Sequence, residues 1–245
     1  MESSNTKMQI LNRDVIKYIA MLTMLLNHIA HMFMPSGEIL TEIFTAIGYF
    51  TAPTMCYFMV EGYEYTRSKR KYGMRLLLFA VISQIPFSLA FNFGNLNMIY
   101  TLLCCFLILV VMEKVSNPFL RMILCMILML ATVVGDWALF APIFTMLFYN
   151  NKDNKGKMLL SYGITAVVFM FITVQSNLMR PQYTTAEAVG FGVLSVIGIA
   201  MSAVVILFLY NGERAKQGRN FSKWFFYIFY PGHLLVLYLV RIFMG

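Results

Sequence analysis

The stretch VIKYIAMLTMLLNHIAHMFM, residues 15–34, decides the fold. Its only charged residue is Lys17, and a helix of about 20 mostly apolar residues is long enough to cross the hydrocarbon core of a bilayer. The run is too long for the apolar core of a typical signal peptide, and no small-residue cleavage site follows it. We therefore expect a membrane-spanning helix that is retained.

The rest of the chain repeats this pattern. Of the 245 residues, 60% are hydrophobic and 12% are charged, whereas an ordinary soluble domain is about 45–50% apolar and about 25% charged. These values predict an all-α, polytopic transmembrane helical bundle that forms a single integral-membrane domain, residues 1–245. We expect about nine spans, of which the sixth is short: 15–34, 39–61, 74–92, 98–113, 119–135, 138–150, 158–176, 187–210 and 224–244. We expect the prolines within these spans to kink helices or to mark broken ones; they are Pro53, Pro86, Pro142 and Pro231.

The positive charges fall on one side of these spans. With nine crossings, 17 of the 19 Lys and Arg lie on the side of the N-terminus, and only Arg180 and Arg241 lie on the other side. Basic residues favour the cytoplasmic face, so we expect the N-terminus inside and the C-terminus outside. This distribution explains the net charge of +8 without a nucleic-acid partner.

All three histidines lie inside predicted spans. His28 and His31 are three residues apart, so they share one face of the first helix, and Asn27 is adjacent to His28. His233 follows Pro231-Gly232 in the last span. An ionisable side chain inside a membrane is a functional hypothesis by default, and imidazole transfers protons near neutral pH. The structural alternatives are a neutral core histidine with one hydrogen bond, or a brace at the Pro-Gly pair.

Other polar residues gather toward the ends of the spans. Asn97 and Asp136 lie on predicted outer connections, where Asp136 serves either a site or a helix N-cap. At the inner end of the second span, Glu61 precedes five basic residues, which suit either the phosphates of coenzyme A or anionic lipid headgroups. These are Arg67, Lys69, Arg70, Lys71 and Arg75. We expect no metal, because His28 and His31 have no obvious further ligands.

Six segments of the chain, taken together, resemble the TraX family of membrane proteins. The most specific is the string Tyr-Pro-Gly-His-Leu, residues 230–234; the others are 19–30, 52–66, 72–76, 83–87 and 97–101. Three positions depart from the family pattern. Asn27 replaces an acidic residue, Tyr49 follows Gly48 where the family tends to have Arg, and Ala138 replaces a Gly.

The resemblance implies a bacterial acyltransferase. TraX is associated with N-acetylation of pilin subunits, and the family is similar to multi-spanning enzymes that move acyl groups from cytosolic acyl-CoA to acceptors at or beyond the membrane. It implies a plasma-membrane location and a catalytic role for His28, either as general base or through a covalent acyl-histidine intermediate. We expect Asn27, Tyr230 or His233 to stabilise the oxyanion. We expect acetyl-CoA or another acyl-CoA as co-substrate, with membrane lipids around the protein.

The predicted residue roles fall into three groups. The catalytic set is His28, Asn27 and His233; the cofactor-binding set is Glu61 with the five basic residues; the substrate-binding set is His31, Asn97, Asp136 and Tyr230. The acceptor remains open among a peptide, a glycan and a lipid. Two other classes also fit the same polar residues: a small-substrate or proton-coupled transporter or flippase, and a non-catalytic membrane maturation partner.

Overall fold

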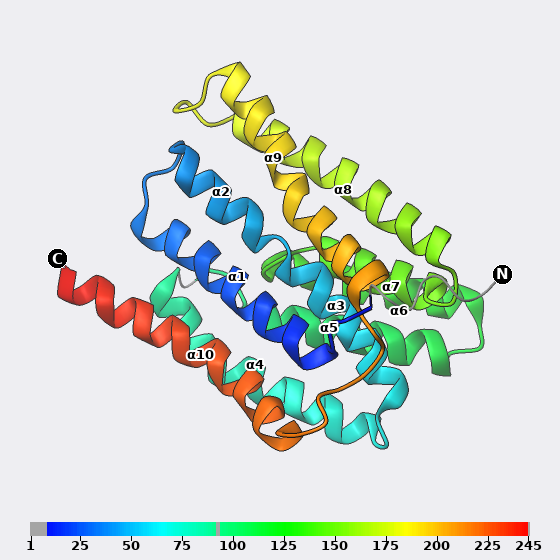
Figure 1. The fold of residues 1–245 in the computed structure, drawn as a ribbon. Helices are drawn as coiled ribbons and strands as arrows, with labels where there is room; N and C mark the ends of the chain where they lie inside the picture. Colours follow the sequence, from blue (N-terminus) through cyan, green and yellow to red (C-terminus); the bar gives the residue numbers. More distant parts are fainter. Residues whose placement is uncertain (1–8, 92–93, 245) are drawn as a thin grey trace. The chain divides into compact units, whose positions relative to one another are not determined.

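The computed structural model describes residues 9–91 and 94–244, and in these ranges its regular elements are all helical. Each of the nine predicted segments coincides with a helix or a pair of helices, which confirms the all-α class (Figure 1). The elements are α1 Arg13–Phe33, α2 Ile39–Gly48, α3 Thr51–Tyr65, α4 Lys69–Ala90, α5 Met98–Lys114, α6 Pro118–Ala131, η1 Thr132–Val134, α7 Phe140–Asn151, α8 Lys155–Leu178, α9 Thr185–Val204, η2 Val205–Leu209 and α10 Arg219–Met244.

Six helical stretches in the described part of the chain are long and apolar enough to cross a membrane. They are Arg13–Phe33, Ile39–Tyr65, Lys69–Ala90, Lys155–Leu178, Thr185–Leu209 and Asn220–Met244. The other three predicted spans form α5, α6 and α7, which have 17, 14 and 12 residues. At 1.5 Å per residue, α7 is about 18 Å long and falls short of the hydrocarbon thickness. The count of nine crossings therefore stays a prediction.

Large apolar side chains remain exposed along these helices, as a lipid-facing surface requires. On α8, Leu160, Ile164, Val167 and Phe171 repeat every three or four residues and are each more than half exposed. Soluble monomers rarely expose a continuous stripe of this kind. The stripe supports the membrane assignment independently of the composition.

The second span is interrupted, as its proline suggests. Helix α2 ends at Gly48, a tight turn passes through Tyr49 and Phe50, and α3 begins at Thr51, two residues before Pro53. Pro86 and Pro231, by contrast, lie inside the continuous helices α4 and α10. Pro142 occupies the first turn of α7, where its missing N–H breaks no intrahelical bond.

The helices form two compact units, each built from separate parts of the chain. Unit 1 comprises residues 1–55 and 154–226, and unit 2 comprises residues 56–153 and 227–245. In unit 1, α1 packs on α2, α2 on α9, and α9 on α8; in unit 2, α5 contacts α4, α6 and α7.

Within unit 2, hydrogen bonds join the ends of several helices. The start of α5 meets the segment before α7: Leu96 donates and accepts backbone hydrogen bonds with Val134 and Asp136. At the same end, Arg241 of α10 donates to the carbonyl oxygens of Leu89 and Ala90 at the end of α4. The three shorter helices therefore alternate in direction beside α4.

Candidate functional site

His28 lies on α1 beside a close contact between α1 and α2. Its side chain is buried, and the neighbouring Asn27 donates from Nδ2 to the carbonyl oxygen of Thr45 on α2, at 3.0 Å. A Cβ at Gly48 would lie 2.2 Å from the Cβ of Asn27. Because helices in membranes approach closely at small residues, Gly48 sets the distance between α1 and α2 at this point.

The interruption between α2 and α3 is bound to α1 through hydroxyl groups. Thr51 donates to the carbonyl oxygen of Ala20 at 2.8 Å, and its hydroxyl lies 3.0 Å from that of Thr23. Both threonines are buried. Ser and Thr hydroxyls stabilise broken membrane helices in this way by satisfying polar groups near the break. This arrangement fixes the part of α1 that leads to His28.

His31 belongs to a separate polar group, at the far end of α1. Its ring is subject to the charges of Glu42 on α2 and Arg180 after α8. Glu42 accepts hydrogen bonds from the backbone N–H of Gly37 at 3.2 Å and from the hydroxyl of Tyr183 at 2.9 Å. This bond and burial raise the pKa of Tyr183. The loops after α1 and α8 are thus joined through Glu42, a connection that the sequence did not reveal.

In unit 2, predicted site residues from three separate segments gather at the start of α5. The backbone N–H of Met98 donates to the hydroxyl of Tyr230 on α10, at 3.2 Å. Thr101 donates to the backbone oxygen of Asp136, at 2.7 Å, and the carboxylate of Asp136 acts electrostatically on Tyr230. Tyr230 and His233 also contact each other, with ring centroids 5.8 Å apart. The structure therefore brings Asn97, Asp136, Tyr230 and His233 into one cluster.

Asp136 occupies an unusual setting between η1 and α7. Desolvation raises the pKa of its carboxyl from 3.8 to about 6, although the N–H of Trp137 acts in the opposite direction. The next turn is strained, because Trp137 and Leu139 have φ angles of 56° and 61°, which non-glycine residues rarely adopt. Helix α7 has Leu139 as its N-cap residue. The alternative that Asp136 caps this helix is therefore wrong.

The hydrogen bonds of His233 and Tyr230 show which of these side chains can donate a further hydrogen bond. His233 Nδ1 lies 2.8 Å from the carbonyl oxygen of Phe229, and because a carbonyl only accepts, Nδ1 of this histidine carries the proton. In the neutral ring, Nε2 is then an acceptor. Tyr230 accepts from the N–H of Met98, which leaves its own O–H proton for donation. Of the three expected oxyanion donors, Tyr230 has the chemistry of a donor here, and neutral His233 does not.

The side chain of Asn97 is fully used in hydrogen bonds within the protein, most of them to the backbone. Its side chain is fully buried, and Oδ1 accepts from the backbone N–H groups of Ile99 and Tyr100 as the N-cap of α5. Both protons of Nδ2 are engaged, by the carbonyl oxygen of Ala80 and by Oε1 of Gln84. No N–H of this amide remains for a ligand, so we assign Asn97 to the stability of α5.

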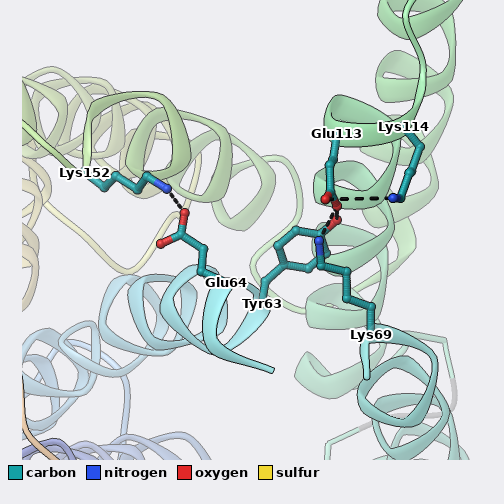
Figure 2. Close-up of polar contacts among 6 residues, drawn as sticks. All are labelled: Tyr63, Glu64, Lys69, Glu113, Lys114 and Lys152. Atoms are coloured by element: carbon teal, nitrogen blue, oxygen red, sulfur yellow. Dashed lines mark hydrogen bonds and ion pairs between the residues drawn. The ribbon is translucent and has the colours of Figure 1, made fainter. Parts of the chain in front are cut away.

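The opposite end of unit 2 holds the predicted cofactor-binding residues. Figure 2 shows Glu113, at the end of α5, accepting from Tyr63 and from Lys69, while Lys114 lies 4.0 Å from its other oxygen. Lys152 forms an ion pair with Glu64. These contacts join the ends of α3, α5 and α7 to the start of α4.

The basic residues divide into two sets. Lys69 pairs with Glu113, and Arg75 packs over the ring of Tyr72, with its Nε buried and without a hydrogen-bond partner among the described residues. Arg67, Arg70 and Lys71 are exposed. Ser68 caps α4 by accepting from the N–H of Lys71, at 3.3 Å, and Glu61 is partly buried near the end of α3. Three cations and a helix N-terminus thus face solvent together, which is a favourable environment for an anion.

Comparison with known protein families gives one match that covers nearly the whole chain. Residues 12–241 match the family described as "TraX protein". The chain belongs to the TraX family. Among curated proteins it is similar to a "Probable fimbrial assembly protein FimC, serogroup H1" of Dichelobacter nodosus, with 26% identity over 94% of this chain and 95% of the relative. No solved structure matches.

The TraX-family motifs include residues at His28 and residues of the cluster at the start of α5. The segments that carry the resemblance include His28 on α1, Asn97 before α5, and Tyr230 and His233 on α10. The family motifs did not point to Glu113 or Tyr183, whose contacts join separate segments. An acidic residue next to lysine at the end of an apolar span, such as Glu113-Lys114, is the sequence signal that indicates such a contact. In the described part of the chain, no group of His, Cys, Asp and Glu suits a metal ion.

Proposed function

We propose that this TraX-family protein is a membrane-embedded acyltransferase that uses cytosolic acyl-CoA. The observation that carries the proposal is the solvent-facing cationic start of α4, where Arg67, Arg70 and Lys71 surround a capped helix N-terminus. Backbone N–H groups, the helix dipole and guanidinium groups together suit the phosphates of coenzyme A. The positive-inside rule predicts that this end of unit 2 faces the cytosol, where acyl-CoA is found.

The proposed reaction needs a base, and His28 is the candidate. The acceptor nitrogen or oxygen attacks the thioester carbonyl and loses its proton to His28. The carbon–sulfur bond then breaks, and His28 returns the proton to the CoA thiolate. The burial of His28 within an apolar helix supports this role, because an ionisable group is costly there unless it has a use.

The oxyanion that forms in this reaction needs a hydrogen-bond donor. Tyr230 is buried, and its hydroxyl is oriented by the N–H of Met98. Removal of one preorganised oxyanion donor lowers kcat by about 10²–10³. We therefore expect Tyr230→Phe to lower kcat by this order, with little change in KM for acyl-CoA. Tyr238→Phe, on the same helix, is the matched control and retains activity.

The curated relative supports one class of acceptor. That protein is named as a probable fimbrial assembly protein. We propose that the acceptor of the present protein is a subunit of a surface fibre, with an amine or hydroxyl as the acylated group. A glycan or lipid acceptor would appear as acyl transfer to membrane extracts that lack such subunits.

The donor site is tested by titration with acetyl-CoA. Arg67→Gln/Arg70→Gln/Lys71→Gln removes the three exposed cations, and we expect KM for acetyl-CoA to rise at least about tenfold, since each phosphate contact is a charge-assisted hydrogen bond. The control, Lys155→Gln/Lys157→Gln, removes two exposed cations at the start of α8. Equal KM values in the two variants would contradict this donor site.

A further inference from the structure

The first turns of α10 and the loop before it carry a surface that acyl transfer does not use. Exposed cations and exposed aromatic rings lie together here, within unit 1. We call it the cationic–aromatic surface; its residues are Arg214, Lys216, Phe221, Lys223 and Trp224.

The loop that presents the two exposed cations is held in place. The backbone N–H of Ala215, between Arg214 and Lys216, donates to the buried carboxylate of Asp14, at 2.7 Å. Two residues earlier, the carbonyl oxygen of Glu213 accepts from the N–H of Arg13, at 2.8 Å. Gly212 and Gly218, with φ angles of 77° and 71°, form the turns on either side. The cations are thus fixed beside the start of α1.

The aromatic residues are held with their rings outward. Phe221 is 66% exposed and stacks on Phe225, with centroids 5.4 Å apart, while Trp224 is 47% exposed and lies under the ammonium of Lys223. The inner side of this turn is secured by Tyr18 of α1, whose hydroxyl lies 3.2 Å from that of Ser222. Ser222 faces Tyr18 on the inner side of the helix. Phe221 and Trp224 therefore lie on the outer side, where they are exposed.

This combination fits one occupant. Aromatic rings favour the headgroup level of a membrane, and Lys and Arg beside them attract anionic lipids of the cytoplasmic leaflet. We propose that the cationic–aromatic surface binds the phosphate of an anionic phospholipid. Arg214, Lys216 and Lys223 contact the headgroup, and Phe221 and Trp224 lie at the level of the glycerol backbone. Glu213 is the exposed acidic residue in this loop, and the carboxylate of Asp14 is already engaged with Ala215.

A second cationic site in the same unit provides the contrast. Lys155 and Lys157, at the start of α8, are also exposed, but the large exposed residues that follow them are Leu159 and Leu160. If anionic lipid stabilised the protein through positive charge alone, it would act equally at the cationic–aromatic surface and at Lys155 and Lys157. The proposal requires anionic lipid to act mainly through the cationic–aromatic surface.

The test compares nanodiscs of phosphatidylcholine alone with nanodiscs that also contain phosphatidylglycerol. The full-length protein is expected to melt on the order of 5 °C higher with phosphatidylglycerol, and the control Lys155→Gln/Lys157→Gln keeps most of this rise. Arg214→Gln/Lys216→Gln/Lys223→Gln loses most of it. Phe221→Ala/Trp224→Ala retains fewer phosphatidylglycerol molecules in native mass spectrometry, a readout that does not depend on stability.

Two results would overturn the proposal. One is an equal rise in the triple variant and in the wild type; the other is an equal rise when soluble glycerol 3-phosphate is added to phosphatidylcholine nanodiscs. If the triple variant does not fold, Arg214→Gln alone is used, because this side chain projects from an exposed loop. None of these readouts involves acyl-CoA, so the lipid site and the acyltransferase proposal stand or fall separately.

Discussion

At the scale of single residues, the packing of Asn27, the neighbour of His28, depends on the absence of a side chain at Gly48. Gly48 permits α1 and α2 to approach until a Cβ would lie 2.2 Å from Asn27. Tyr49, which stands where the family tends to have Arg, packs edge-on against Phe169 with centroids 4.9 Å apart. This departure from the family pattern thus has a packing role in the present chain.

Gly48→Ala is expected to lower stability by about 1–3 kcal/mol, because the new methyl group forces α1 and α2 apart. Thermal unfolding in detergent, followed by loss of helical signal, measures the effect. Gly163→Ala on α8 is the control, since nothing lies within 4 Å of its added Cβ and alanine favours a helix. Equal destabilisation of both variants would contradict the close approach.

Asp136 is expected to make stability depend on pH. Its carboxyl has a pKa of about 6 in the folded protein and 3.8 ordinarily, so between these values the folded state binds the proton more tightly. The stabilisation is complete below about pH 4 and is lost as the pH rises through about 6. The melting temperature should fall over this range in the wild type and less steeply in Asp136→Asn. Parallel curves would show that other groups cause the dependence.

At the scale of elements, polar contacts at helix ends determine how the shorter helices associate. Glu113 joins α5 to both α3 and α4, through Tyr63 and Lys69. Both partners of the ion pair are about one-third exposed, so solvent screens part of their attraction. The bond from Tyr63 adds a second partner that is less exposed to water.

Glu113→Gln is therefore expected to cost about 1 kcal/mol, as measured by thermal unfolding in detergent. Asp153→Asn, an exposed acid in the turn after α7, is the control and should change stability by less than about 0.5 kcal/mol. The charge swap Lys69→Glu/Glu113→Lys should recover part of the loss. No recovery in the swap would indicate that the bond from Tyr63 is the main contribution.

The elements were predictable from the sequence because apolar length alone defines them. The residues 39–61 were expected as one span, and Pro53 indicated a kink or a break. The structure places the break just before this proline, at Tyr49 and Phe50, where the hydroxyl of Thr51 reaches Ala20. The exact position of the break depends on contacts between α3 and α1, and the hydropathy of the sequence does not reveal these contacts.

The candidate site was predictable in part. Asp136, Tyr230 and His233 were selected as polar residues at the ends of spans or within them, and the structure brings them together. Asn97 was selected on the same grounds but caps α5, because an amide before a helix suits either role. Tyr183 and Glu113 were missed, since their partners are distant in sequence. The adjacent Glu113 and Lys114 indicate a contact at a helix end, but they do not identify the partner.

At the scale of the whole molecule, the number of crossings decides the sides of the two termini. The positive-inside pattern predicts nine crossings and termini on opposite sides, whereas six crossings would place both termini on the same side. Alkaline phosphatase fused after Gly245 should be active in a bacterial host, and green fluorescent protein fused there should be dark. Fluorescence at both termini would show an even number of crossings.

The acyltransferase assignment is the central claim, and acyl-CoA turnover tests it most directly. The purified protein, incubated with acetyl-CoA and a candidate fibre-subunit peptide, is predicted to release free CoA in step with acylated peptide. His28→Ala should lose at least about 10²-fold in rate while unfolding at a similar temperature. Release that is unchanged in His28→Ala, or no release by the wild type with acetyl or longer acyl chains, would contradict the account.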